Sequence, residues 1–412
     1  MKNIKLSSMK EGYMPKPKIP YIRVGTDYFK KIVKPDRFGI DRIELKRWTK
    51  ETLVFDHDKK YLYSIPTYDD FIIEPNNDKK QPSFHNCYNM YRDFPHTPKK
   101  GDWPWTFILL KHIFGTQFKS GMIYLKTLYE HPKQALPVLV LVSKTRQTGK
   151  STFLDWLNML FGANMVMIEP DVIGSTFNGE YATSNIIAID ETILDKQAAV
   201  EKIKSLATKK FISVNVKQVA QFTLPFFGKI IMASNNEDKF MRIDDEEIRF
   251  WVRKISTPKT ENHNILNDMV DEIPAFLHYL KTMPEIDFSK SRMVLTEDQI
   301  KNEYLDAVKK ESYSGLYKEL CELFTDYFDN NEVDSVNATV LDIKNKWFAR
   351  DNNTSASYIR RVLKMEFKKD TPARPFSYSP FDDINKKFGR AFEFKLTEFT
   401  TKTDKEDESA PF

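Results

Sequence analysis

A short loop between an apolar run and a helical pattern constrains the fold of this chain more than any other feature. Residues 138–142 (VLVLV) are apolar throughout, as is typical of a parallel strand covered on both faces. The loop after this strand contains Gly149, Lys150 and Ser151, and a helical pattern follows over residues 152–161. Because backbone N–H groups at the start of a helix attract anions, this order predicts a strand, loop and helix that together bind phosphate.

The residues of the loop fit the chemistry of nucleotide binding. In a GxxxxGK[ST] loop, backbone N–H groups surround the β-phosphate, the lysine contacts the β and γ oxygens, and the hydroxyl holds Mg²⁺. We therefore expect ATP and Mg²⁺ as ligands, with the nucleotide bound by Thr148, Gly149, Lys150, Ser151 and Thr152. The position five before Gly149 is Lys144 instead of glycine. The simpler alternative is an ordinary strand-to-helix turn whose lysine points into solvent.

Two further apolar runs end in side chains that suit hydrolysis. Hydrolysis needs one carboxylate to orient Mg²⁺ and another to polarise the attacking water. The run at 186–190 ends in Asp190, followed by Glu191; we assign Asp190, with Ser151, to the metal and Glu191 to the general base. The run at 229–234 is followed by Asn235, whose amide can hold the lytic water or the γ-phosphate. An acidic pair that caps the next helix is the structural alternative for the two carboxylates.

Arginines after Asn235 are candidates for a finger that reaches the γ-phosphate of a neighbouring subunit. Such a guanidinium raises the hydrolysis rate by about 10³ to 10⁵ in other NTPases. Arg249 is our choice, and Arg242 and Arg253 are the competing fingers. Arg249 could instead pair with an acidic neighbour on its own surface, namely Asp244, Asp245 or Glu246.

The apolar pattern along the chain predicts an α/β fold built from several parts. Candidate strands at 138–142, 186–190, 211–216 and 229–234 alternate with helical patterns, which indicates a parallel sheet, and all but 211–216 are apolar almost throughout. A chain of 412 residues is long enough for two or three domains. We predict a basic, proline-rich arm at 1–20, an α+β region at 21–135, an ATPase domain at 136–300, a further domain at 305–400 and a disordered tail at 401–412.

Composition and charge limit the classes of protein to which the chain can belong. Apolar residues make up 41% and charged residues 29%, as in globular proteins, and no apolar run approaches the roughly 20 residues of a spanning helix. We therefore expect a cytoplasmic protein without membrane contact. Net charge is +5, yet residues 1–50 hold 14 Lys and Arg against 5 Asp and Glu. This basic segment suits a polyanionic partner, and a solvated lysine-rich surface is the alternative.

Metal binding by cysteine and histidine has little support in the sequence. The two cysteines, Cys87 and Cys321, are too few for a disulfide framework. His85, Cys87 and His96 could supply three zinc ligands. A structural zinc site needs four, and no fourth strong ligand lies at suitable spacing, so zinc is the less favoured interpretation.

The region after residue 312 has the pattern of a winged helix-turn-helix. Three helical patterns, SGLYKELCELFTDYF, VLDIKNKWFA and SASYIRRVLKMEF, come before two extended aromatic segments, PFSYSPF and RAFEFKL, which we expect to form a ribbon. Thr354 is the expected N-cap of the third helix. One face of that helix is apolar and the others carry cations, with predicted DNA contacts at Arg360, Arg361 and Lys364. Docking to a protein is the alternative.

Taken in order, these segments resemble superfamily 3 helicases, in particular the primase-helicase proteins of phages and mobile elements with a poxvirus-type ATPase core. The resemblance covers roughly residues 21–300 and is carried by SKTRQTGKSTFLDWL, IIAIDET, EKIKSLATKKFISVNVKQV, FFGKIIMASNNEDKF and DEEIRFWVRKI. It implies an AAA+-like P-loop NTPase core and a hexameric ring that threads one strand and moves 3′ to 5′. The N-terminal region would then form a collar on the ring.

The resemblance also implies a DNA contact between the second and third motifs. In that family a β-hairpin there places its tip in the channel, and here the region holds Lys209, Lys210, Lys217 and Gln218. Lys217 is the expected phosphate contact, because a lysine in a pore grips each phosphate without reading bases. Residues 1–135 lack closely spaced carboxylates with a nearby histidine for primer synthesis. A separate primase or polymerase is therefore an expected partner.

Together these inferences predict an ATP-dependent DNA helicase that acts on single strands and forked duplexes in the replication of a phage or mobile element. A replication initiator that uses ATP only to assemble on DNA, without unwinding it, is the first alternative. A P-loop small-molecule kinase is the second. It would need an acceptor pocket and a mobile arginine-rich lid, whereas segment 193–228 has the pattern of a helix and a hairpin.

Overall fold

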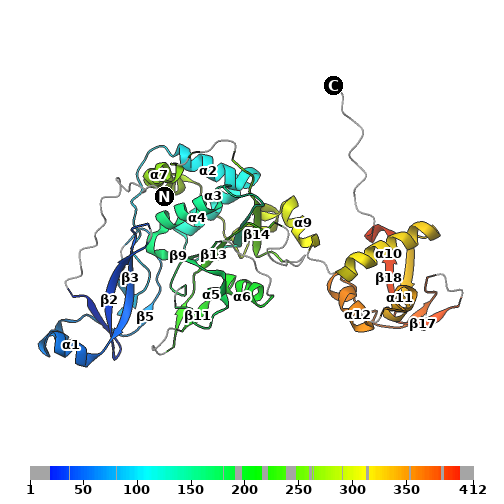
Figure 1. Cartoon of the computed structure of the whole chain (residues 1–412), viewed down its shortest axis with the longest axis horizontal. Coiled ribbons are helices and arrows are strands. Elements are labelled where there is room, and N and C mark those ends of the chain that lie inside the picture. The colour runs from blue at the N-terminus through cyan, green and yellow to red at the C-terminus, as the bar shows by residue number, and fades with distance from the viewer. Residues whose placement is uncertain are drawn as a thin grey trace, which may run out of the picture. The chain divides into compact units, whose positions relative to one another are not determined.

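The chain divides into two compact units, Met1–Lys309 and Lys310–Phe412 (Figure 1). The structure is a computed structural model, and it describes residues 19–36, 38–79, 81–179, 181–190, 197–215, 221–237, 247–258, 262, 264–289, 291–311, 315–351, 354–381 and 385–399. Within that part of the chain, no helix combines the length and the apolar character that crossing a bilayer requires. The finer domain boundaries expected from the sequence remain predictions.

A five-stranded parallel sheet forms the core of the first unit, which confirms the α/β class. Its strands follow the order β14–β8–β13–β10–β9, and each neighbouring pair is parallel. Three of the expected strands are in this sheet. The bounds are β8 (Val138–Val142), β9 (Met165–Ile168), β10 (Ile186–Ile189), β13 (Lys229–Ser234) and β14 (Phe250–Lys254).

The expected strand at 211–216 is not part of the parallel sheet. In the described part of the chain, β11 (Phe211–Val214) pairs only with β12 (Phe222–Pro225), in an antiparallel hairpin. Its side chains alternate between exposed and buried, whereas every residue of β8, β10 and β13 is buried. A strand with one solvated face belongs at the surface, so the polar residues in FISVNV distinguish it from the core strands.

Helices cover both faces of the parallel sheet. Alternate residues of β8 point to opposite faces, so that Leu139 and Leu141 join one apolar cluster and Val138, Val140 and Val142 join the other. The first cluster contains α2 (Pro104–Phe114), α3 (Phe118–Glu130), α4 (Lys150–Phe161) and α7 (Ile265–Thr282). The second contains α5 (Pro170–Gly174), α6 (Gln197–Ala207) and α9 (Glu303–Glu311). Figure 1 shows α2, α3, α4 and α7 on one side and α5 and α6 on the other.

Smaller sheets and short helices make up the rest of the first unit. The N-terminal sheet has the order β3–β2–β1–β4 and a second sheet the order β5–β7–β6. The strands are β1 (Tyr21–Val24), β2 (Asp27–Pro35), β3 (Asp41–Trp48), β4 (Thr67–Tyr68), β5 (Phe71–Ile72), β6 (Ser83–Phe84) and β7 (Cys87–Asn89). The helices are α1 (Lys50–Asp56), η1 (Lys60–Ser64), η2 (Gly115–Gln117), η3 (Gly162–Asn164) and α8 (Glu297–Ile300).

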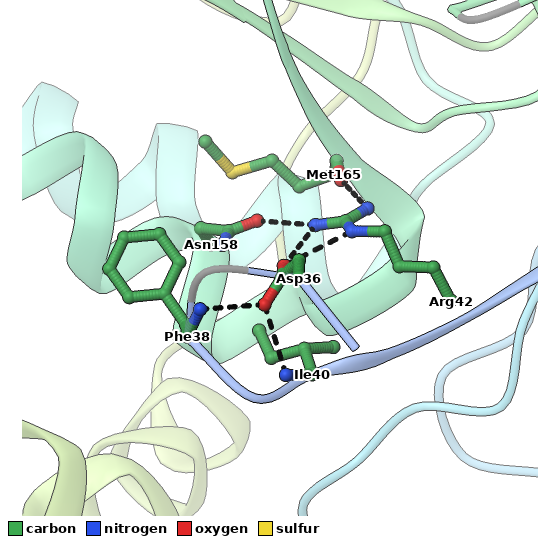
Figure 2. Close-up of polar contacts among 6 residues, drawn as sticks. All are labelled: Asp36, Phe38, Ile40, Arg42, Asn158 and Met165. Atoms are coloured by element: carbon green, nitrogen blue, oxygen red, sulfur yellow. Dashed lines mark hydrogen bonds and ion pairs between the residues drawn. The ribbon is translucent and has the colours of Figure 1, made fainter. Parts of the chain in front are cut away.

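One arginine ties the N-terminal sheet to the parallel-sheet core. The Arg42 guanidinium donates to the Met165 carbonyl oxygen at 2.7 Å and to Asn158 Oδ1 at 2.9 Å, so it joins β3 to β9 and α4 (Figure 2). Asp36 Oδ2 accepts from the same guanidinium at 2.9 and 3.1 Å. The other oxygen of Asp36 accepts the amides of Phe38 and Ile40. Because two nitrogens of the planar guanidinium contact Asp36 while the group also donates to Met165 and Asn158, the single nitrogen of a lysine could not reproduce these four bonds.

The second unit combines helices with two short antiparallel strand pairs. The three expected helices are present as α10 (Gly315–Asn331), α11 (Val340–Trp347) and α12 (Ala356–Met365). β16 (Phe376–Tyr378) pairs with β17 (Lys387–Gly389), and β18 (Phe392–Lys395) pairs with β15 (Ser335–Ala338). η4 (Leu396–Glu398) follows.

Two local expectations for this unit were wrong. The two aromatic segments do not pair with each other, because β18 pairs with β15, a strand that the sequence analysis did not predict. The N-cap of α12 is Ser355 instead of Thr354: the Ser355 hydroxyl accepts the Tyr358 amide at 3.1 Å, whereas Thr354 is buried. Either residue type can cap a helix, so sequence could not separate the two positions.

A buried carboxylate, Asp342 on α11, joins three elements of the second unit. Its Oδ2 accepts from the Thr339 amide at 2.9 Å and hydroxyl at 2.6 Å, and from the Tyr378 hydroxyl of β16 at 2.7 Å. Its Oδ1 forms an ion pair with Lys387 of β17 at 2.9 Å. Burial alone would raise the pKa of Asp342, but these hydrogen bonds and the ion pair lower it from 3.8 to about 2.

We predict that Asp342→Asn destabilises the second unit at neutral pH and about half as much at pH 3. The folded pKa lies below the unfolded value, so the carboxylate contributes roughly 2 kcal/mol above pH 4 and loses that contribution as pH falls towards 2, with roughly half left at pH 3. Hydrogen exchange of peptides covering α11 and β15, corrected for intrinsic rates, measures the loss of stability in the variant at pH 7 and pH 3. Asp329→Asn, at an exposed position on α10, is the control. If the two variants changed hydrogen exchange equally, the stabilising role of the Asp342 carboxylate would be contradicted.

Candidate functional site

The loop between β8 and α4, residues 143–149, turns through two left-handed residues. Gly149 precedes α4 with φ of +88°, and Gln147 has φ of +58°. A side chain at Gly149 would be strained by that φ, and its Cβ would lie 3.3 Å from Leu109 of α2. Lys144 is not among the residues of positive φ. The missing first glycine is therefore no obstacle to the loop conformation.

The Lys150 ammonium group is buried at the centre of the site. The residue is 5% exposed, and its Nζ donates to Thr148 Oγ1 at 3.2 Å, to Asn235 Oδ1 at 3.0 Å and to Ser143 Oγ. All three acceptors are neutral oxygens, and no carboxylate in the described residues forms an ion pair with it. Burial lowers the pKa of Lys150, while the charges of Asp190 and Glu237 raise it. The site thus holds a cation that an anion would stabilise.

Ser151 and Asp190 meet next to this cation. The Ser151 hydroxyl donates to Asp190 Oδ2 at 3.0 Å. Asp190 directly follows β10, and Asn235 directly follows β13, which lies between β8 and β10 in the sheet. The strand order therefore brings together at one edge four side chains that the sequence analysis singled out: Lys150, Ser151, Asp190 and Asn235. Thr152 lies in the first turn of α4, and Glu191 is outside the described residues.

Three residues at the site were not singled out from sequence. Ser143, the first residue after β8, accepts from Lys150 and contacts the Thr148 hydroxyl at 3.1 Å. His112 of α2 lies with Nε2 3.0 Å from the Thr148 carbonyl oxygen. Because a carbonyl only accepts, Nε2 is the protonated ring nitrogen. Glu237 follows Asn235 by two residues, and this closeness to a predicted site residue is the one signal that sequence offers for it.

Glu237 connects the loop to the end of β14 and to α9. Its Oε1 accepts the Lys144 amide at 2.7 Å, and its Oε2 pairs with Lys254 at 2.9 Å. The Tyr304 hydroxyl of α9 donates to its backbone carbonyl at 2.6 Å. Burial raises the pKa of Glu237, but the bonds from Lys254 and Lys144 outweigh it and lower the pKa. The carboxylate is therefore held ionised beside Lys150.

The candidate finger, Arg249, lies at the amino ends of the strands, opposite to the carboxyl ends that form the site. It directly precedes β14, whose Phe250 pairs with Val138 at the start of β8. A five-residue strand spans roughly 16 Å, which exceeds the length of an arginine side chain, so Arg249 cannot reach the loop of its own chain. Its Nε pairs with Glu247 Oε1 at 3.1 Å; the acidic neighbours named in the sequence analysis, 244–246, and Arg242 are outside the described residues. Arg253 donates to Ile113 and Gln117 inside the unit.

The hairpin lysines fall into two groups. Lys209 and Lys210 are exposed and stand at the base of the β11–β12 hairpin, while Lys217 and Gln218 are outside the described residues. The hairpin is fixed through Asn178, which donates to the Ser213 carbonyl at 2.8 Å and accepts the Asn215 amide at 2.8 Å. These side-chain bonds hold β11 and the residue that follows it.

The remaining candidates lie elsewhere. Arg360, Arg361 and Lys364 of α12 are exposed, and the Arg361 guanidinium lies 5.0 Å from the centre of the Tyr358 ring. The possible zinc ligands do not converge: His96 Nε2 is bonded to the Met159 carbonyl, and the Cys87 thiol contacts the His85 carbonyl. The described residues contain no group of three or more metal-binding side chains from His, Cys, Asp and Glu.

Comparison with known proteins places the fold. Residues 141–253 match the model of a family of unknown function (DUF5906). No curated protein matches the chain. Similar solved structures are apo forms of the C-terminal region of NrS-1. One, of residues 305–718, is 18% identical with a TM-score of 0.62, covering 87% of this chain and 95% of that chain. An A form is 18% identical with a TM-score of 0.63, covering 89% and 94%. At such identities the likeness shows the fold alone.

Proposed function

We propose that the protein is an ATP-dependent DNA helicase with an AAA+-like P-loop NTPase core, acting in the replication of a phage or mobile element in the host cytoplasm. The observation that carries this proposal is the buried ammonium of Lys150, whose three hydrogen-bond acceptors are neutral oxygens at the carboxyl edge of a parallel sheet. Ligands of open α/β sheets bind at that edge. A triphosphate would place negative charge directly on this ammonium, in addition to the more distant charges of Asp190 and Glu237.

The residues present fit ATP with Mg²⁺. Lys150 would bind the β and γ oxygens, and the amides at the start of α4 would surround the β-phosphate. Ser151 and Asp190, already bonded to each other, would hold Mg²⁺, which neutralises charge on the transferring phosphate. Asn235 would turn its amide from Lys150 to the lytic water or the γ-phosphate. Glu191 is the proposed general base.

The proposed DNA contacts are sequence-independent. The hairpin would present Lys217 to the phosphates of a threaded single strand, with Lys209 and Lys210 at its base. The second unit is proposed to be a winged-helix-like domain that binds duplex or forked DNA through Arg360, Arg361 and Lys364. These three cations are exposed, while the apolar face of α12 is buried in its own unit.

A hexamer is the proposed working assembly, because Arg249 cannot act within its own chain. The alternative, an initiator that uses ATP only to assemble on DNA, differs from a motor in that it does not separate the strands. A separate primase or polymerase remains a proposed partner.

Lys150→Ala is expected to lower the rate of ATP hydrolysis at least about a hundredfold, because the main charge that stabilises the transferring phosphate is lost. Mg–ATP should raise the melting temperature of the wild type and leave that of the variant unchanged. Lys119→Ala, an exposed lysine of α3, is the control. A variant that still hydrolyses ATP at the wild-type rate would contradict the proposal.

Glu191→Gln is expected to bind ATP and assemble while losing unwinding of a forked duplex. The amide keeps the size of the base but cannot accept a proton from water. Strand displacement and mass photometry on the same samples measure both properties. Unwinding that persists in the variant would reject Glu191 as the base. Wild-type protein that hydrolyses ATP without displacing a strand would favour the initiator.

Arg249→Ala is expected to lose activity alone and to regain part of it when mixed with Lys150→Ala protein. A boundary between an Arg249→Ala subunit with an intact loop and a Lys150→Ala subunit with an intact arginine is complete. ATPase rates of the two variants, separately and after mixing, test this. Mixtures no more active than the separate proteins would remove Arg249 from the proposed finger position.

A further inference from the structure

The N-terminal sheet has one face that is rich in cations and turned away from its apolar core. Ile22, Val24 and Phe29 point to the face that packs on Tyr88. Their neighbours along the strands point to the other face, as strand geometry requires. That second face carries the cations Arg23, Lys30, Lys34 and Lys46, and also Arg42, which pairs with Asp36.

Two of these lysines oppose each other directly. Lys30 of β2 and Lys46 of β3 are paired across the strands. Like charges in that arrangement repel, and no carboxylate in the described part of the chain forms an ion pair with either. Lys34 differs, because Glu44 lies 2.5 Å away. The Lys30–Lys46 pair therefore leaves a local excess of positive charge that an anion would relieve.

An aromatic cluster borders this charge. The Lys30 ammonium lies 4.5 Å from the centre of the Trp48 ring and 5.5 Å from that of Tyr21. The segment that follows Trp48, comprising α1 and η1, packs on the same cluster through Leu53, Tyr61 and Leu62. The lysines, the cluster and this segment thus share one face of the sheet.

The same segment holds two aromatic rings almost fully in solvent. Phe55 is 90% exposed and Tyr63 is 92% exposed, the highest values among the exposed large apolar side chains of the described residues. Neither ring contributes to a core, so the fold gains nothing from them. An exposed ring can stack on a base, and such stacking requires that the base be unpaired.

We propose that this face of the N-terminal sheet binds single-stranded DNA, with Lys30 and Lys46 on the phosphates and Phe55 and Tyr63 stacked on bases. Two lysines on neighbouring strands supply the phosphate contacts, and exposed rings on the adjoining segment select unpaired bases over a duplex. The surface lies outside the nucleotide site and needs no ATP. The choice of DNA over RNA rests on the proposed function, whereas the surface itself does not.

The test is the binding of labelled dT20 to the full chain without nucleotide or Mg²⁺, by fluorescence anisotropy at 50 and 200 mM NaCl. K30Q/K46Q should weaken binding at 50 mM and reduce the slope of log K against log salt by about 1.4, because each single-strand phosphate contact contributes about 0.7. K119Q/K301Q, two exposed lysines with no ion pair in the described residues, carries the same charge change and should leave both unchanged.

The contribution of the aromatic side chains to binding is tested separately. Phe55→Leu and Tyr63→Leu should each weaken binding about fivefold or more, and Phe55→Trp should restore it, since only a ring can stack. Both side chains are solvent-exposed, so these changes leave the fold intact. Irradiation of a 5-iodouracil strand should cross-link peptides that contain Phe55 or Tyr63, as mass spectrometry would show.

Four results would overturn the proposal: equal effects of the two lysine double variants, cross-links confined to other peptides, tighter binding of a duplex than of dT20, or binding of rU20 alone. ATPase activity measured without DNA is a separate assay. A protein without ATPase that still binds dT20 through these residues would refute the proposed motor and keep this surface. The reverse outcome would refute the surface and keep the motor.

Discussion

The buried ammonium of Lys150 is the constraint on which the candidate site depends. A cation at 5% exposure among neutral oxygens is costly unless an anion joins it. Its position requires Gly149 in a left-handed conformation, since only glycine adopts that φ without strain. It also requires β13 between β8 and β10, because that order delivers Asn235 to the ammonium. Both the strand order and the loop conformation are therefore needed to place the Lys150 ammonium.

Local pattern was enough to predict that four side chains of the candidate site lie together. β8, β10 and β13 are apolar because both faces of the sheet are covered, so their ends could be located from sequence alone. In a parallel sheet those ends share one edge, and this placed Lys150, Ser151, Asp190 and Asn235 together without further information. β9 and β14 were not identified; both are only partly buried, and FWVRK ends in two cations instead of continuing as an apolar run.

The residues of the candidate site that were not singled out from sequence reach it through contacts between distant segments. His112 reaches Thr148 from α2, and Glu237 reaches the Lys144 amide across 93 positions of sequence. Neither contact follows from spacing along the chain, because each depends on how a helix or a loop packs on the sheet. The pairing of β18 with β15 has the same origin. Residues 335–338 show only weak apolar alternation, so a partner more than fifty residues away decides that they form a strand.

β14 has a charged residue near each of its two ends, and the two residues have different roles. Lys254 at its carboxyl end pairs with Glu237, which accepts the amide of Lys144 in the β8–α4 loop, and Arg249 precedes its amino end. A paired strand has no internal hinge, because its ladder to β8 fixes each residue. A change in the loop that displaced Glu237 would therefore act on the whole strand and on the Glu247–Arg249 pair beyond it. If a neighbouring chain receives Arg249, the strand itself is the mechanical link between one nucleotide site and the next.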